Sequence, residues 1–363
     1  MTVFTCIFLI LSGSFPEFVP PPTGTGDEIL PLNPRSFGMG GICAGVPDST
    51  SFSMLNPAAS AWTLNSGVCF AGRYSEGDVP AWDNSFGVPL ISAVVPLPGR
   101  IVVTAAIDGK SRLNASEEMI FDEFSGDLSW SGGLVESYTG LSVRATDWLA
   151  FSFGGRCTFG SIVSDVTLIP DNPGYYPTKE IVYRDDVSFR QAWGGVFGLF
   201  VNSDRFGLGF SISTDRKGIL DIHRDYEYYD PDSSSQMYTI PGELSAGISY
   251  RPLERLLIGL DIYSRKSLDV FGYITDSGTI ISAGSEVYIG SGVIARTGYS
   301  HMNGLWRDGA DRFTAGAGLV FGDGKAGIDL STGFQFWRNI QDEFQKETVL
   351  FISLWATEKW LGE

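Results

Sequence analysis

Apolar residues occupy every second position in one segment after another of this chain, and nowhere do they form a long unbroken run. Clear examples are residues 149–159 (LAFSFGGRCTF), 206–212 (FGLGFSI), 244–250 (LSAGISY) and 256–262 (LLIGLDI). Because a strand points successive side chains to opposite faces, each segment predicts a strand with one apolar face and one small or polar face. Segments of about ten residues exceed the ~5–6 residues of most globular strands and match the ~9–11 residues that cross a bilayer at a tilt.

The composition excludes several other classes of protein. The mean hydropathy of +0.06 is too high for a disordered acidic chain, although the net charge is −17. A helical membrane protein needs runs of about 20 apolar residues, which are absent from the sequence. Nucleic-acid binding is disfavoured because the negative charge would repel phosphate.

Short and long connections alternate along the chain, and this alternation predicts the strand number. Six tight turns are expected at 97–100, 146–147, 203–204, 252–253, 289–292 and 323–324. Seven longer polar connections are expected at about 75–84, 109–130, 163–190, 215–239, 266–278, 303–311 and 339–346. Together they predict an all-β fold of about 14 strands over residues 66–363 with both ends on one side, the layout of a transmembrane antiparallel β-barrel in the bacterial outer membrane.

The first 65 residues differ from the rest. Residues 1–14 combine an apolar stretch with small residues and are predicted to be a signal peptide, the alternative being a buried N-terminal strand. Residues 15–65 hold a proline-rich spacer and the candidate for a plug inside the lumen. The remaining cysteines, Cys43, Cys69 and Cys157, have neither disulfide nor metal-ligand spacing.

No motif in the sequence predicts an enzyme, a cofactor or a metal site. Residues 322–327 (GDGKAG) match the spelling of a dinucleotide-binding loop, but the next residues alternate as a strand, so a hairpin turn is predicted. The two histidines, His223 and His301, lack metal spacing. A hydrolase triad assembled across strands depends on geometry alone, and nothing in the sequence favours it.

Several charged residues fall on the predicted polar, inward faces of strands. They are Glu136, Arg156, Glu243, Asp261, Glu286, Arg296 and Asp329. Glu286 and Arg296 flank the 289–292 turn symmetrically, so they are expected to be cross-strand neighbours. We interpret these lumen charges as pairs that keep the wall rigid, with substrate contact as the alternative. Since 14 strands enclose more space than their side chains fill, the lumen needs a further occupant or is a pore.

Two motifs resemble a known family. The run Arg-Ser-Phe-Gly-Met-Gly-Gly at 35–41, Asp48, and Asn-Pro-Ala at 56–58 resemble the N-terminal signature of FadL-like outer-membrane barrels, which include long-chain fatty-acid transporters and PorV/PorQ-type proteins. Residues 284–299 resemble a late hairpin of the same group. The resemblance implies a barrel whose N-terminal segment plugs the lumen. The plug or gating residues are then Gly38, Gly40, Gly41, Asp48, Asn56 and Pro57.

The expected function is passive transport of hydrophobic, fatty-acid-like small molecules. The alternative implied by the PorV branch is a non-transporting scaffold or shuttle for a secretion system, and an open porin is less favoured because of the plug. The expected partners are outer-membrane lipid with a hydrophobic small molecule or secretion-system proteins, and no nucleic acid.

Overall fold

In the computed structural model, 14 antiparallel strands close into a β-barrel, as the alternation of turns predicted. The structure describes residues 27–28, 33–47, 54–77, 85–109, 111–120, 124–170, 181–226, 229–270, 273–275, 277–290, 292–304, 309–338 and 344–358. The strands of the barrel wall are β2 (Ser66–Gly77), β3 (Ser85–Leu97), β4 (Ile101–Gly109), β6 (Phe124–Arg144), β7 (Leu149–Pro170), β8 (Ile181–Asn202), β9 (Phe206–Ser213), β12 (Glu243–Leu253), β13 (Leu256–Arg265), β16 (Gly278–Gly290), β17 (Val293–Asn303), β18 (Ala310–Phe321), β19 (Ala326–Arg338) and β20 (Phe344–Glu358). Pairing of β2 with β20, from Ser66 opposite Glu358 to Gly77 opposite Glu347, closes the ring.

The remaining elements lie inside or above this wall. They are β1 (Asp27–Glu28), α2 (Pro34–Gly38), η1 (Pro57–Trp62), β5 (Ser111–Ile120), β10 (Arg216–Tyr226), β11 (Tyr229–Ile240), β14 (Leu268–Val270) and β15 (Tyr273–Thr275). None of the helices in the described part of the chain is long and apolar enough to cross a membrane.

The six tight turns gather at one end of the barrel. Five of them join β3 to β4, β6 to β7, β8 to β9, β16 to β17 and β18 to β19 where the sequence predicted them. The turn between β12 and β13 lies at Glu254–Arg255, just beyond the predicted 252–253, because Leu253 still pairs with Leu256. Residues 322–325 form the predicted hairpin turn, in which Gly322, Asp323 and Gly324 have positive φ.

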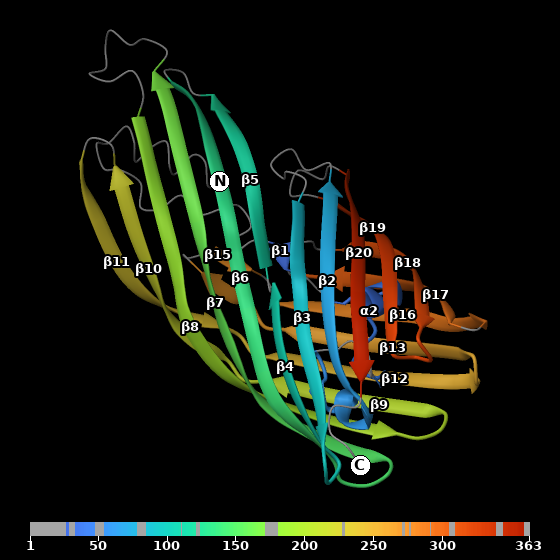
Figure 1. Cartoon of the computed structure of the whole chain (residues 1–363). Helices are drawn as coiled ribbons and strands as arrows, with labels where there is room; N and C mark the ends of the chain where they lie inside the picture. Colours follow the sequence, from blue (N-terminus) through green and yellow to red (C-terminus); the bar gives the residue numbers. More distant parts are fainter. Residues whose placement is uncertain are drawn as a thin grey trace.

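Three of the predicted long polar connections are largely strands, which corrects the sequence interpretation. Residues 109–130, 163–190 and 215–239 contain β5, β10, β11 and the outer halves of β6, β7 and β8. These strands rise together beyond the rest of the wall (Figure 1), and we call them the tower. The sequence pattern missed them because their exposed face is mostly polar, so the apolar alternation that marks the other barrel strands weakens there.

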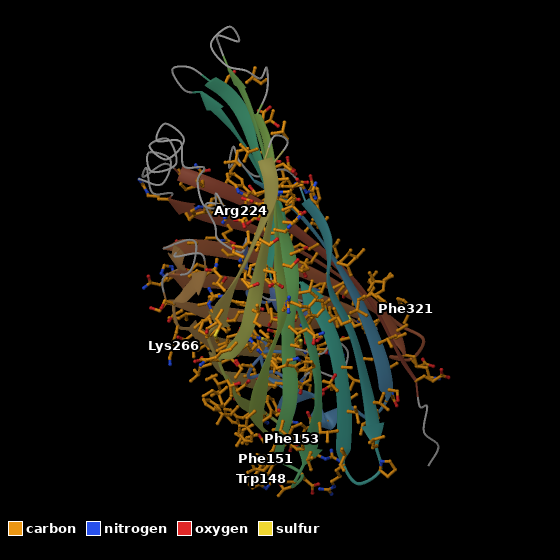
Figure 2. The ribbon with its side chains drawn as sticks, turned by 90° about the vertical axis from the view of Figure 1, so that its left-hand side faces the viewer. Trp148, Phe151, Phe153, Arg224, Lys266 and Phe321 are labelled. Carbon is orange, nitrogen blue, oxygen red and sulfur yellow. The ribbon has the colours of Figure 1, made fainter. Side chains whose placement is uncertain are left out.

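The two faces of the wall exchange character between the barrel and the tower. On the barrel part of β8 the outer side chains are apolar, with Phe197 and Trp193 43% and 64% exposed. Above Trp193 most outer positions of β8 are polar, among them Arg190, Ser188 and Arg184, whereas Val182 is apolar and exposed. A bulge between β7 and β8 near Gly160 accompanies the change by shifting the side-chain alternation of β8 by one residue. Figure 2 shows Trp148 and Phe153 at the short-turn end and Arg224 on the tower.

Candidate functional site

The N-terminal segment, residues 33–47 and 54–65, lies inside the ring of strands. Helix α2 contacts β17, β18, β19 and β20, whereas η1 contacts β4, β6, β7, β8 and β9. Asn33 caps α2 by accepting a hydrogen bond from the Ser36 amide, and Asn56 caps η1 by accepting one from Ala58. In each helix a proline follows the cap at the first helical position, where its missing N–H is not needed.

Glycines of the wall form the surface on which this segment rests. A Cβ placed on Gly298 would collide with the backbone of Gly40, and one placed on Gly209 would collide with the carbonyl of Ala44. Gly40 itself has φ +76° and would bring a Cβ within 2.6 Å of the Tyr299 backbone. Further wall glycines whose Cβ would meet the segment are Gly198, Gly207, Gly247, Gly259, Gly284, Gly316 and Gly333. We call Gly209, Gly298 and these seven the glycine seat. At Gly209, Gly284 and Gly298 the wall and the segment therefore meet backbone to backbone, which any larger residue would prevent.

Hydroxyls of the wall bind the carbonyls of the segment. Ser331 donates to the Pro34 carbonyl at 2.6 Å, Ser249 to the Gly45 carbonyl at 2.7 Å, and Ser142 to the Pro57 carbonyl at 2.9 Å. These bonds satisfy buried backbone groups that no regular ladder reaches.

A buried carboxylate holds the middle of the segment. Asp261 on β13 accepts hydrogen bonds from three successive amides, those of Cys43 at 2.6 Å, Ala44 at 2.5 Å and Gly45 at 3.3 Å. Successive backbone N–H groups that converge in this way form an anion-binding nest. Asn56 adds a bond from its Nδ2 to the Ala44 carbonyl at 2.8 Å and so joins the two parts of the segment.

A first ion-pair cluster joins four strands. Arg156 lies 2.9 Å from Glu243 and 3.6 Å from Glu136, while Arg216 lies 2.9 Å from Glu243 and also contacts Glu136. All four side chains are at most 5% exposed. Arg156 also donates to the Met54 carbonyl, so the cluster contacts the N-terminal segment.

A second cluster ties α2 to the opposite part of the wall. Glu286 accepts from Arg35 at 3.0 Å through both oxygens and from Arg296 at 2.8 Å. Arg296 in turn binds Asp329 at 2.5 Å, and Asp329 accepts from the Trp355 indole at 3.1 Å. A bidentate Arg–carboxylate pair fixes geometry as well as charge.

The structure thus places the seven sequence-predicted lumen charges in three groups. Glu136, Arg156 and Glu243 meet in the first cluster, Glu286, Arg296 and Asp329 meet in the second, and Asp261 stands alone against the segment. Gly38, Gly40, Gly41, Asn56 and Pro57 are within the segment, whereas Asp48 lies outside the described residues.

Sequence reasoning missed Arg35 and Arg216. Arg216 falls in the stretch interpreted as a loop, and only its place at the start of β10 brings it to Glu136. Arg35 stands in the motif at 35–41, but its partner Glu286 is 251 residues away in the chain.

Above the charged clusters the inner face of the tower is apolar. Ile162, Val187 and Leu220 are fully buried there, and Phe189 meets Tyr238 edge to face at 5.2 Å. Further buried apolar residues on this face are Leu128, Trp130, Leu134, Val166 and Ile222. Across the barrel a second apolar cluster comprises Tyr263, Ile280, Met302, Ala310 and Trp337, with Leu55 of the segment packed against it. A small cavity lies beside that cluster, lined by Gly40, Gly41, Leu55, Tyr263, Ile280 and Arg312 among others.

Asp185 and Arg224 are charged residues on the apolar face of the tower. Asp185 is 2% exposed, and its Oδ1 lies 3.6 Å from Nε of Arg224. Burial raises the pKa of Asp185 to about 6, although Arg224 opposes the shift.

Solved structures share this fold. A FadL homologue of Pseudomonas aeruginosa superposes with a TM-score of 0.71 at 13% identity, over 91% of this chain and 99% of that one. The toluene transporter TbuX of Ralstonia pickettii gives 0.65 at 14% identity, over 92% and 98% of the two chains. The toluene transporter TodX of Pseudomonas putida gives 0.63 at 14% identity, over 93% and 100%.

These similarities define the class by fold: the chain has the architecture of a FadL-type outer-membrane barrel. No family model and no curated protein matches the sequence.

Proposed function

We propose that this protein is an outer-membrane barrel that conducts hydrophobic small molecules passively. The observation that carries the proposal is the apolar inner face of the tower, whose strands are mostly polar on their outer face. Strands outside the membrane have no lipid to cover, so an inward apolar face there suits capture of an apolar molecule. FadL-type folds of proteins described as toluene transporters support the same class of ligand.

The membrane location rests on the outer surface of the barrel. Exposed apolar side chains such as Phe153, Phe197, Leu208, Leu260 and Leu354 cover the outer positions of its strands. A band of this kind meets lipid, and closure of the sheet leaves no edge strand unpaired within it.

The N-terminal segment acts as the plug in this proposal. It occupies the ring below the tower, held by the glycine seat, the Asp261 nest and the Arg35–Glu286 pair. A ligand caught on the tower passes when part of the segment moves away from the wall. The other lumen charges keep the wall rigid, because each carboxylate of the two clusters already faces an arginine.

Fatty acids and small aromatic hydrocarbons are both ligands of the proposed class. A binding experiment separates them: calorimetry of the detergent-folded barrel with laurate and with toluene. We expect calorimetry to detect binding, with an affinity that is at least fivefold lower in Trp130→Ala or Phe189→Ala. Phe153→Ala, on the lipid side, is the matched control and should bind as the wild type does. Absence of binding by a well-folded barrel would contradict the proposal.

A scaffold or shuttle of the PorV type is the second candidate. The observation in its favour is the tower, whose polar outer face projects from the membrane and carries ion pairs such as Arg184–Asp165 at 3.7 Å. A lumen filled by the N-terminal segment also suits a protein that transports nothing. This candidate takes the lead if the folded barrel binds neither laurate nor toluene.

A further inference from the structure

Arginines lie directly opposite each other at the short-turn end of the barrel. The Arg144 amide donates to the Arg100 carbonyl at 3.0 Å, one step beyond the Ile101–Val143 pair of β4 and β6. The Arg251 amide donates to the Arg205 carbonyl at 2.8 Å, one step beyond the Phe206–Tyr250 pair of β9 and β12. Like charges directly opposite on a ladder destabilise it, so each pair needs a compensating anion.

Side-chain alternation places these arginines on the inner face of the barrel mouth. On β9 and β12 the buried, lumen-facing residues include Gly207 and Ser249, each two positions from Arg205 or Arg251. Alternation also places Arg255 on the inner face, and its carbonyl accepts from the Tyr288 amide at 2.9 Å. The same is true of Lys325, whose carbonyl accepts from the Thr357 amide at 2.6 Å.

These residues form a group that we call the basic rim: Arg100, Arg144, Arg205, Arg251, Arg255 and Lys325. Five of the six short turns contribute to it, the turn at 289–292 being the exception. The same turns also carry four carboxylates, Asp147, Asp204, Glu254 and Asp323. The rim is therefore distinguished by the inward position of its cations rather than by their number.

Internal carboxylates compensate only part of the rim. Asp147 lies 3.0 Å from Arg100. Arg205, Arg251 and Arg255 are exposed and form no ion pair with any residue in the described part of the chain. Asp204 and Glu254 lie on the same turns, but strand alternation places them on the outer face of the barrel.

We propose that the basic rim docks an acidic surface of a periplasmic protein. The proposal rests on the proposed function for the side of the membrane, because short turns of outer-membrane barrels face the periplasm. Inward parity points the rim away from the bilayer, so lipid phosphates are not its partner. Since neighbouring strands are about 4.8 Å apart, successive short turns stand roughly 10 Å apart and one small anion spans few of them. An acidic protein face meets them all, and long-range attraction would steer it to the barrel mouth.

The test measures binding of a fluorescein-labelled oligoglutamate peptide to the detergent-folded full-length barrel by anisotropy at low salt. The variant Arg205→Gln/Arg251→Gln/Arg255→Gln removes the uncompensated part of the rim. We expect affinity to fall about tenfold, because each exposed charge contact contributes little alone. The control Arg184→Gln/Arg190→Gln/Lys217→Gln removes the same charge from the outer face of the tower and should change affinity less than twofold.

Three results would overturn the proposal. The rim variant could bind the peptide as tightly as the wild type does, or the tower control could lose as much affinity as the rim variant. Inorganic phosphate could also displace the peptide at the same total concentration of negative charge. Misfolding is not the expected cause of a loss, because the variant removes like-charge repulsion. On a gel, the change in mobility that marks unfolding on heating should therefore occur at the same temperature as in the wild type or at a higher one. Calorimetry of the same variant with laurate and toluene tests the proposed function separately, and the affinity for these compounds should be unchanged.

Discussion

At the scale of single residues, the barrel interior depends on buried charges that are neutralised within the protein. Glu286 and Arg296 illustrate what sequence can predict: their symmetric spacing about a turn predicted the cross-strand pair, which the structure has at 2.8 Å. Arg35 could not be predicted as their third partner, because no local pattern links residues 251 positions apart. Arg216 was hidden for another reason, since its segment has the polarity of a loop.

Removing one member of the second cluster should be costly. Glu286→Ala removes the carboxylate that pairs with Arg35 and leaves Arg296 with Asp329 alone, and breaking a buried pair in this way costs about 3–5 kcal/mol. We expect a lower urea midpoint for unfolding in lipid vesicles. Asp165→Ala, on the exposed Arg184–Asp165 pair, is the control and should cost less than about 1 kcal/mol. Equal midpoints for the two variants would contradict the role assigned to Glu286.

The glycine seat gives a second prediction at this scale. Gly298→Ala places a methyl against the Gly40 backbone, so the segment should be displaced and the barrel should leak. Sensitivity of cells to a large polar antibiotic measures the leak. Gly155→Ala is the matched control, because a Cβ there meets no atom within 4 Å. If a folded Gly298→Ala barrel is no more permeable to the antibiotic than the control, the glycine seat does not keep the lumen closed.

Asp185 gives the tower a pH dependence. Because its pKa in the folded protein, about 6, exceeds the ordinary aspartate value of 3.8, folding favours the protonated form. Stability of the tower should therefore decrease as pH rises from about 4 through 6 and remain lower above that range. Hydrogen exchange of β8 and β10 amides, corrected for intrinsic rates, should show more protection at pH 4.5 than at pH 7.5. Asp185→Asn should remove the difference; its persistence would assign the effect to another group.

At the scale of elements, the tower is the feature that sequence patterning failed to predict. In the membrane strands an apolar outer face alternates with glycine and serine, and this contrast is easy to read. In the tower the apolar face is inside, as for Val187 and Phe189, and the bulge near Gly160 shifts the alternation between the two regions. If one alternation is extended along the whole of β8, the side chains of its tower half are therefore assigned to the wrong faces.

The exchange of faces can be tested on β8 itself. Phe197→Lys puts a charge on the lipid side, where Lys near the bilayer midplane costs about 2–4 kcal/mol. Ser188→Lys puts the same charge on the outer face of the tower, where water solvates it. We expect the first variant to fold poorly into vesicles and the second to fold as the wild type does. Equal folding yields would contradict the assignment of Phe197 to the lipid side of β8.

At the scale of the whole molecule, the alternation of short and long connections was sufficient to predict the barrel. It yielded the strand number and the end at which the first barrel strand begins and the last one finishes. The alternation of short and long connections persists even where strands replace the predicted loops. The path through the lumen could not be predicted, since it depends on how residues 33–47 and 54–65 pack against strands from several parts of the ring. The placement of charge also becomes clear only at this scale: on the short turns, strand alternation puts Arg205, Arg251 and Arg255 on the inner side and Asp204 and Glu254 on the outer side.

Uptake across an intact outer membrane tests the central claim most directly. Cells that lack other routes for hydrophobic molecules should accumulate radiolabelled laurate or toluene at least several times faster when they produce this barrel than when they do not. Cells that produce the Trp130→Ala/Phe189→Ala barrel in equal amount should lose most of that gain. Uptake of both compounds at the background rate by cells with a folded, surface-exposed barrel would contradict the account.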